Sequence, residues 1–132
     1  MKILAVITTV SGFLAVALGA FGAHALRNTV APEMLGIWQT AVQYQMFHVL
    51  VLLSIVIAES RSTGTLMRVA GWLFVMGTVL FSGSLYLLVI TGIKALGMIT
   101  PIGGGLFLMG WLVLSFALVK FIAAQRSSVS NR

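Results

Sequence analysis

The sequence predicts an all-α membrane protein, an antiparallel bundle of four transmembrane helices with both termini in the cytoplasm. Three observations lead to this fold class. Hydrophobic residues make up 60% of the 132-residue chain and charged residues only 8%, whereas soluble domains carry about 25% charged residues. Four uncharged segments have the length of a membrane span. The basic residues between these segments are distributed unequally between the two sides.

The length of the apolar segments predicts the four spans. A helix that crosses the ~30 Å hydrocarbon core needs about 20 mainly apolar residues. The segments that meet this length are 3–23, 38–58, 69–90 and 99–119. The gaps between them are short, so neighbouring helices are expected to be antiparallel. Together the spans form a single membrane domain, and a short basic cytoplasmic tail is expected at 120–132.

The positions of the basic residues predict the orientation. An even number of spans puts both termini on one side, together with the loop at 59–68. The side that holds the termini carries six basic residues: Lys2, Arg61, Arg68, Lys120, Arg126 and Arg132. The opposite side carries only Arg27 and Lys94. Cytoplasmic loops carry an excess of Lys and Arg, which places the termini in the cytoplasm. The cations stand singly between apolar runs, so no nucleic-acid partner is expected.

A cleaved signal peptide is the alternative interpretation of the first span. Ala23-His24-Ala25 has the A-x-A form of a cleavage site. The apolar run before it is longer than the usual 7–15 residues of a signal peptide, and its charged n-region is minimal. An uncleaved first span is therefore favoured.

Small residues predict where the helices pack, because close backbone approach replaces the hydrophobic drive in lipid. The first span has small residues at a spacing of four: Ser11, Ala15, Gly19 and Ala23. The third span contributes Gly71, Thr78 and Ser82. The last span has them at the spacing of seven expected for a left-handed bundle: Gly103, Gly110, Ala117 and Ala124.

Aromatic residues and a proline mark the ends of the spans. Trp72 at the cytoplasmic end, with Trp38 and Tyr86 at the outer end, is typical of aromatic belts. Trp111 falls near mid-membrane, and we expect it to pack inside the bundle. Thr100, followed by a proline, is expected to cap the last helix.

Polar residues are concentrated in the outer half of the membrane. His48 lies ten residues beyond the start of its span, about 15 Å deep and near the midplane. Helical geometry places Tyr44 and Gln45 on the same face as His48. On the third span Thr78, Ser82 and Tyr86 form a polar stripe at a spacing of four, and Ser84 points away from it. The candidate site or network residues are His24, Thr40, Tyr44, Gln45, His48, Ser82, Ser84, Tyr86 and Thr100.

The residue types exclude most catalytic chemistry. The chain has no cysteine and no aspartate, and its only carboxylate side chains are Glu33 and Glu59. This excludes thiolate metal sites and Ser-His-Asp triads, so we expect no catalytic residue and no enzyme. A haem between His24 and His48 is disfavoured because their heights differ by about 12–15 Å. Zinc on His24 and Glu33 would lack ligands. No cofactor and no metal are expected.

Four motifs resemble a known family. They are GAFGAH at 19–24, TAVQYQMFH at 40–48, FSGSLY at 81–86 and ITPIGG at 99–104. In this order they resemble the small bacterial inner-membrane family catalogued as domain of unknown function 423, which is similar to the eukaryotic transmembrane protein 256. The resemblance implies a multi-span protein of the bacterial cytoplasmic membrane and no established activity. Its motifs contain all nine candidate polar residues.

Two functional interpretations remain open. The first is a structural or accessory inner-membrane protein, whose outer-half polar residues form an interhelical network and whose partners are lipids and a membrane protein or a second copy. The alternative is an outward-facing binding protein for a small molecule or lipid, or a minimal transporter, that uses the cluster around His48. A continuous pore is disfavoured because the inner half is almost purely apolar, and an enzyme acting on lipid is the least favoured.

Overall fold

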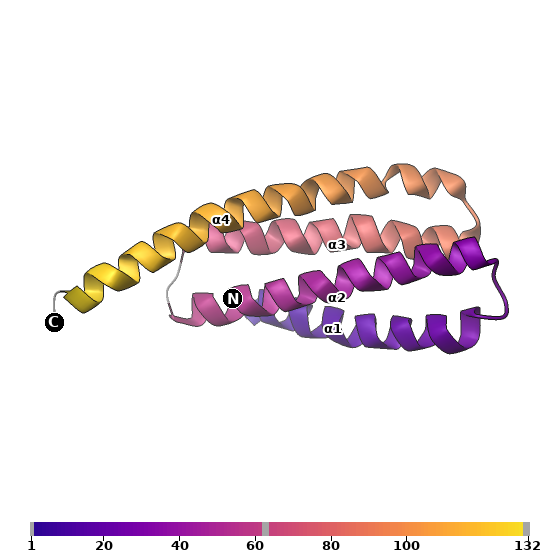
Figure 1. Cartoon of the computed structure of the whole chain (residues 1–132), viewed down its shortest axis with the longest axis horizontal. Coiled ribbons are helices and arrows are strands. Elements are labelled where there is room, and N and C mark those ends of the chain that lie inside the picture. The colour runs from indigo at the N-terminus through magenta and orange to yellow at the C-terminus, as the bar shows by residue number, and fades with distance from the viewer. Residues whose placement is uncertain (1, 62–63, 131–132) are drawn as a thin grey trace.

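A computed structural model describes residues 2–61 and 64–130, and it contains four long helices that alternate in direction (Figure 1). They are α1 (Lys2–Phe21), α2 (Pro32–Arg61), α3 (Thr65–Thr91) and α4 (Thr100–Ser130). Four helical stretches are long and apolar enough to cross a membrane: Lys2–Leu26, Pro32–Glu59, Thr65–Thr91 and Lys94–Ala123. The predicted all-α fold with four spans is confirmed. Arg132 and the side chains of Arg61, Ala124 and Arg126 lie outside the described part of the chain.

Two short helices shape the connections at one end of the molecule. α1 continues into η1 (Gly22–Leu26), a π-helical segment, and η2 (Lys94–Met98), a 3₁₀ segment, precedes α4. α3 ends at Gly92, whose φ of +71° is left-handed and whose N–H donates to the Leu88 carbonyl at 2.8 Å. Glycine adopts this conformation without a Cβ clash, so it ends the helix sharply.

The helices pack in sequence order rather than around a common axis. α1 packs on α2, α2 on α3 and α3 on α4. Among the described residues, no Cα atom of α4 lies within 8 Å of a Cα atom of α1 or α2. In Figure 1, α3 accordingly lies between α4 and α2. The four helices are therefore antiparallel but do not form a closed bundle: the backbone of α4 lies close to that of α3, whereas side chains such as Phe107 and His48 join α4 to α2.

The contact between α3 and α4 follows the predicted small residues. A Cβ atom added to Gly103 would lie 2.8 Å from the Phe81 Cα, and one added to Gly110 would lie 2.9 Å from the Phe74 ring. Ala117 is buried further along the same face. These three positions confirm the predicted spacing of seven on the last span. Their lack of bulk allows the two backbones to approach closely.

The contact between α1 and α2 differs from the prediction at its outer end. Ala15 is buried, and a Cβ atom on Gly19 would meet Val42 at 3.4 Å, as the small-residue stripe predicts. Ala23, however, is exposed, and Gly22 is buried in its place. The wide turn of η1 shifts the helical phase, so a regular spacing of four fails at this point.

Two residues assigned to an aromatic belt instead point inward. Trp38 is only 1% exposed, and its Nε1–H donates to the Leu18 carbonyl at 2.8 Å. Its ring packs against Phe21 and Tyr86 and fills the space beside Gly22. The belt prediction is wrong for Trp38 and for Tyr86, because each finds a hydrogen-bond partner on a neighbouring helix. Trp72 is exposed.

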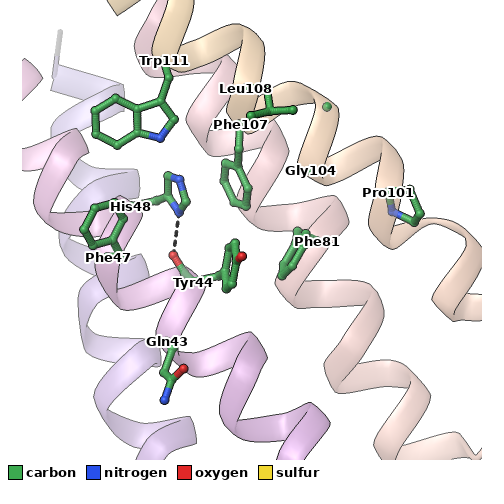
Figure 2. A pocket seen from close by; sticks show the side chains of 11 residues that line it. Gln43, Tyr44, Phe47, His48, Phe81, Pro101, Gly104, Phe107, Leu108 and Trp111 are labelled. Carbon is green, nitrogen blue, oxygen red and sulfur yellow. Dashed lines mark hydrogen bonds between the residues drawn. The ribbon is translucent and has the colours of Figure 1, made fainter.

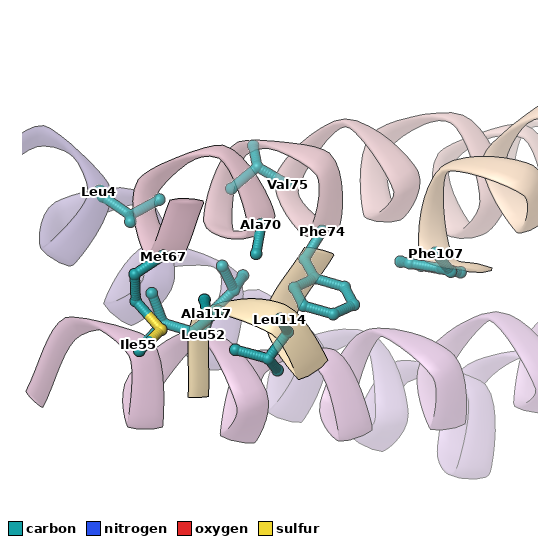
Figure 3. Packing of buried hydrophobic residues seen from close by; sticks show 10 residues of the cluster. All are labelled: Leu4, Leu52, Ile55, Met67, Ala70, Phe74, Val75, Phe107, Leu114 and Ala117. Carbon is teal, nitrogen blue, oxygen red and sulfur yellow. The ribbon is translucent and has the colours of Figure 1, made fainter. Parts of the chain in front are cut away.

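The main apolar core lies toward the end that holds the termini. Figure 3 shows Phe74 of α3 facing this cluster, with Leu4 from α1 at its far side. The cluster joins all four helices through Leu4, Leu52, Ile55, Met67, Ala70, Phe74, Val75, Phe107, Leu114 and Ala117. This core agrees with the apolar inner half that the sequence predicts, although Thr8 and Glu59 are also buried at this end.

Candidate functional site

Gln45 links three helices through its side-chain amide. Its Nε2 donates to the Ser11 carbonyl of α1 at 2.9 Å. Its Oε1 accepts from the Tyr86 hydroxyl of α3 at 2.8 Å. The Gln45 side chain is 5% exposed, so these bonds satisfy a polar group that would otherwise be costly to bury. They bind α1, α2 and α3 together in the half of the molecule away from the termini.

Two further hydrogen bonds join the helices, one between α3 and α2 and one between α3 and α4. The Ser82 hydroxyl donates to the Ala41 carbonyl of α2 at 2.8 Å, and the hydroxyls of Ser84 and Thr100 share a hydrogen bond of 2.9 Å. The divergence of Ser82 and Ser84 around α3 is therefore as predicted. Thr100 is the first residue of α4, not its cap, because its hydroxyl pairs with Ser84 while Ile99 accepts from the first turn.

Four candidate residues lie outside this network. The Thr40 hydroxyl donates to the Gly36 carbonyl of its own helix at 3.0 Å. His24 is exposed in η1, where it makes no hydrogen bond to a described residue. Tyr44 and His48 instead face the space between α2 and α4. The structure thus divides the predicted set between a network and a separate site.

A groove of about 810 Å³ lies between α2 and α4 and is backed by α3 (Figure 2). We call it the α2–α4 groove. It exists because α4 packs on α3 without approaching the α2 backbone. Most of its walls are aromatic or apolar, and the residues that line it are Gln43, Tyr44, Phe47, His48, Phe81, Pro101, Gly104, Gly105, Phe107, Leu108 and Trp111.

His48 is held firmly at the inner end of the groove. Its ring stacks on that of Phe107, with centroids 3.6 Å apart and planes 4° from parallel. Its Nδ1 lies 2.7 Å from the Tyr44 carbonyl oxygen. The side chain is 3% exposed, and Nε2 has no partner among the described residues. An unpaired buried polar atom is unusual in native proteins and calls for an explanation.

The geometry around Nδ1 assigns the proton on the neutral His48 ring. A carbonyl oxygen can only accept, so Nδ1 must carry the hydrogen that it donates to Tyr44. Nε2 then presents a lone pair and acts as an acceptor. The site therefore contains one buried acceptor, surrounded by aromatic rings.

Trp111 and Tyr44 form the walls beside His48. Trp111 contacts the rings of His48 and Phe74 but remains 40% exposed, so the expectation that it packs inside a bundle is only partly correct. Figure 2 shows its indole nitrogen on the side of the ring toward His48. Tyr44 stacks on Phe81 with centroids 4.3 Å apart. Both rings have one face toward the groove because no α2–α4 backbone contact closes it.

Sequence reasoning missed several residues that the structure places in important contacts. Phe107 and Trp111 are four residues apart on α4, a spacing that signals a shared face. At the other end, Glu59 has a fully buried side chain, and its Oε1 accepts from Arg68 Nε at 3.2 Å. Glu59 Oε2 has no partner among the described residues. The opposite charges nine residues apart across a short turn were the available signal for this pair.

Comparison with known proteins identifies the family. The model of the family described as "Protein of unknown function (DUF423)" matches residues 18–104. The UPF0382 membrane protein YwdK of Bacillus subtilis is 42% identical over 95 residues, which cover 71% of this chain and 77% of YwdK. The UPF0382 membrane protein SAB0533 of Staphylococcus aureus is 46% identical over 94 residues, covering 71% and 76%.

An inner-membrane protein is also among the relatives. The UPF0382 inner membrane protein YgdD of Escherichia coli is 39% identical over 93 residues, which cover 70% of this chain and 71% of YgdD. No solved structure matches. These matches do not test the likeness to transmembrane protein 256, which stays a prediction. With four candidate spans and this family match, the chain belongs to the UPF0382 (DUF423) family and is a multi-pass protein of the bacterial inner membrane.

Proposed function

We propose that this protein binds a lipophilic molecule in the α2–α4 groove and that it is not an enzyme. The observation that carries the proposal is the unpaired Nε2 of His48, which is buried at a groove of about 810 Å³. Small-molecule sites typically have volumes of about 300–1,000 Å³, with mostly apolar walls and a few polar groups that orient the ligand. The α2–α4 groove has these properties.

The surroundings of the groove favour a ligand that arrives through the bilayer. The groove opens sideways between two helices that both cross the membrane. Phe47 and Leu108, on opposite walls, are 56% and 69% exposed. In a bilayer such surfaces face acyl chains, so a hydrophobic ligand would enter laterally without crossing water. Membrane lipids are therefore both the solvent of this protein and a source of ligands.

We also propose that both termini are cytoplasmic, which places the groove in the outer half of the membrane. Six basic residues on the side of the termini, against two on the other, support this orientation. Fusion of alkaline phosphatase or a fluorescent protein to the C-terminus tests it. Only the fluorescent fusion should be active, because alkaline phosphatase folds outside the cytoplasm. An active phosphatase fusion would reverse the assignment.

Filling the groove tests the binding proposal. Gly105 lines the groove, and a Cβ atom there would have nothing within 4 Å, so Gly105→Trp should fill the groove without disturbing the fold. Leu112→Trp is the matched control, because Leu112 is 59% exposed on α4 and does not line the groove. Purified protein is extracted with organic solvent, and retained molecules are measured by mass spectrometry.

The wild type and Leu112→Trp should retain a common lipophilic species that Gly105→Trp has lost. Equal retention by all three proteins would contradict the proposal. The proposal is also contradicted if none of the three proteins retains a lipophilic molecule and none takes up such a molecule when it is added.

A structural or accessory role is the second candidate, and the interhelical hydrogen bonds favour it. Five polar side chains form hydrogen bonds between helices: Gln45, Ser82, Ser84, Tyr86 and Thr100. Such bonds are worth ~0.6 kcal/mol each in membranes, so their first effect is to hold the scaffold. An accessory protein would act through a second copy or another membrane protein. Native mass spectrometry from the membrane tests this, since a free 14.1 kDa chain would count against it.

A further inference from the structure

We infer that the ligand of the α2–α4 groove is a lipid-soluble phenol or alcohol whose hydroxyl donates to His48 Nε2. The inference rests on the proposed function and specifies its ligand class. Three features of the groove support it: the acceptor on His48, the donor on Trp111 and the stacked aromatic walls.

The first feature is the direction of the missing hydrogen bond. Nδ1 of His48 donates to the Tyr44 carbonyl at 2.7 Å, so Nε2 of the neutral ring can only accept. A ligand that offers only carbonyl or ether oxygens would place two acceptors against each other. His48 is 3% exposed, and its Nε2 has almost no accessible surface and no described partner, so a ligand reaches this atom only when a wall residue beside it, such as the 40% exposed Trp111, moves aside. The ligand must therefore bring an O–H or N–H group.

The second feature is Trp111, which distinguishes a hydroxyl from an ammonium group. The rings of Trp111 and His48 have centroids 6.4 Å apart and planes inclined by 61°. Figure 2 shows the indole nitrogen on the side toward His48. The indole N–H can only donate. A hydroxyl oxygen can accept from Trp111 while its hydrogen goes to Nε2, whereas an ammonium group would have no lone pair for Trp111.

The third feature is the shape of the apolar walls. Tyr44 stacks on Phe81 at a centroid distance of 4.3 Å, and Phe107 stacks on His48 at 3.6 Å. Flat rings therefore line one side of the groove, and aromatic groups pack well in offset or edge arrangements against such rings. The volume of about 810 Å³ leaves room for an aromatic ring with an alkyl chain. The chain would extend through the lateral opening into lipid.

Two probes that differ in one hydrogen test the inference. The protein is placed in lipid nanodiscs with ¹⁵N-labelled histidine and titrated with para-octylphenol or with its methyl ether, para-octylanisole. The two histidines, His24 and His48, give separate signals. The phenol should shift the Nε2 signal of His48 alone, and it should bind about tenfold more tightly than the ether, the effect of one hydrogen bond to a buried acceptor.

Three variants make the outcomes distinguishable. His48→Phe keeps a ring against Phe107 and should remove the preference for the phenol, while His24→Phe should retain it. Gly105→Trp, which fills the groove, should prevent binding of both probes. If the phenol and ether bind equally and Gly105→Trp blocks both, the hydroxyl inference is overturned and the groove remains a binding site. If neither probe binds the wild type, both the inference and the proposed function fail.

Discussion

Gly103→Ala should weaken the contact between α3 and α4, and the structure allows the size of the effect to be worked out. The new Cβ atom would lie 2.8 Å from both the Cα and the Cβ of Phe81, whereas ordinary van der Waals contact begins at 3.4 Å. The obstructing atoms include backbone, so no side-chain rotation relieves the clash. The backbone N of Phe81 would lie closer still, so α4 must move away from α3 by more than 0.6 Å.

The energetic cost has two parts. Overpacking of a tight contact costs about 1–3 kcal/mol. The same displacement stretches the hydrogen bond between Ser84 and Thr100, three residues from the substitution, which at an average membrane value is worth ~0.6 kcal/mol. We therefore expect a loss of about 1.6–3.6 kcal/mol in the free energy of unfolding, because the close backbone contact of α4 among the described helices is with α3.

The adjacent glycines are the controls. A Cβ atom on Gly104 would meet the Phe81 ring at 3.9 Å, and one on Gly105 would have nothing within 4 Å. Alanine at either position should change stability by less than ~0.5 kcal/mol, or raise it slightly, since alanine favours helix. Thermal unfolding in detergent and steric trapping in bicelles measure the three variants. The reasoning is refuted if Gly103→Ala is as stable as Gly105→Ala.

Three further substitutions test other contacts. Gln45→Leu breaks two interhelical hydrogen bonds and should cost ~1–2 kcal/mol of unfolding free energy, whereas Gln43→Leu, on the exposed wall of the groove, should cost under ~0.5 kcal/mol; equal losses would contradict the network. Arg68→Leu leaves the buried Glu59 carboxylate unpaired and should destabilise by ~1–3 kcal/mol, while the double variant Glu59→Leu/Arg68→Leu should recover stability in the same thermal assay. A double variant as unstable as the single would disprove this. Trp38→Phe loses the hydrogen bond to α1 but keeps a large ring, so it should lower the Tm less than Trp38→Ala does. Equal decreases in Tm would show that packing is not the main contribution of Trp38.

Much of the fold was predictable because lipid imposes simple rules. Membrane thickness sets the length of a span, and the requirement to satisfy backbone groups makes each span a helix. The spacing of Gly103, Gly110 and Ala117 identified the face of α4 that meets α3 because small residues are the main packing signal in lipid. The split between Ser82 and Ser84 followed from helical periodicity alone.

The candidate site was less predictable, because periodicity relates residues within a helix but does not say which neighbour a face meets. A helix face that contacts lipid and one that contacts another helix can both consist of the same apolar residue types. The open side between α2 and α4 therefore left no trace in the pattern, and Trp111 was expected inside a bundle. The π-helical turn at η1 likewise changed the phase of α1, so that Gly22 replaced Ala23 against Trp38.

The close backbone contact of α4 with α3, without one to α2, separates two properties that are usually entangled. The glycine face of α4 determines whether the protein folds, and the opposite wall of the same helix, around Leu108 and Trp111, determines the width and chemistry of the cavity. Substitutions of the exposed Leu108 can change ligand selectivity at little stability cost, whereas Trp111 also packs on the rings of His48 and Phe74. A designer who wished to retarget this scaffold could vary the exposed groove positions of α4, Gly105 and Leu108, and leave three helices untouched.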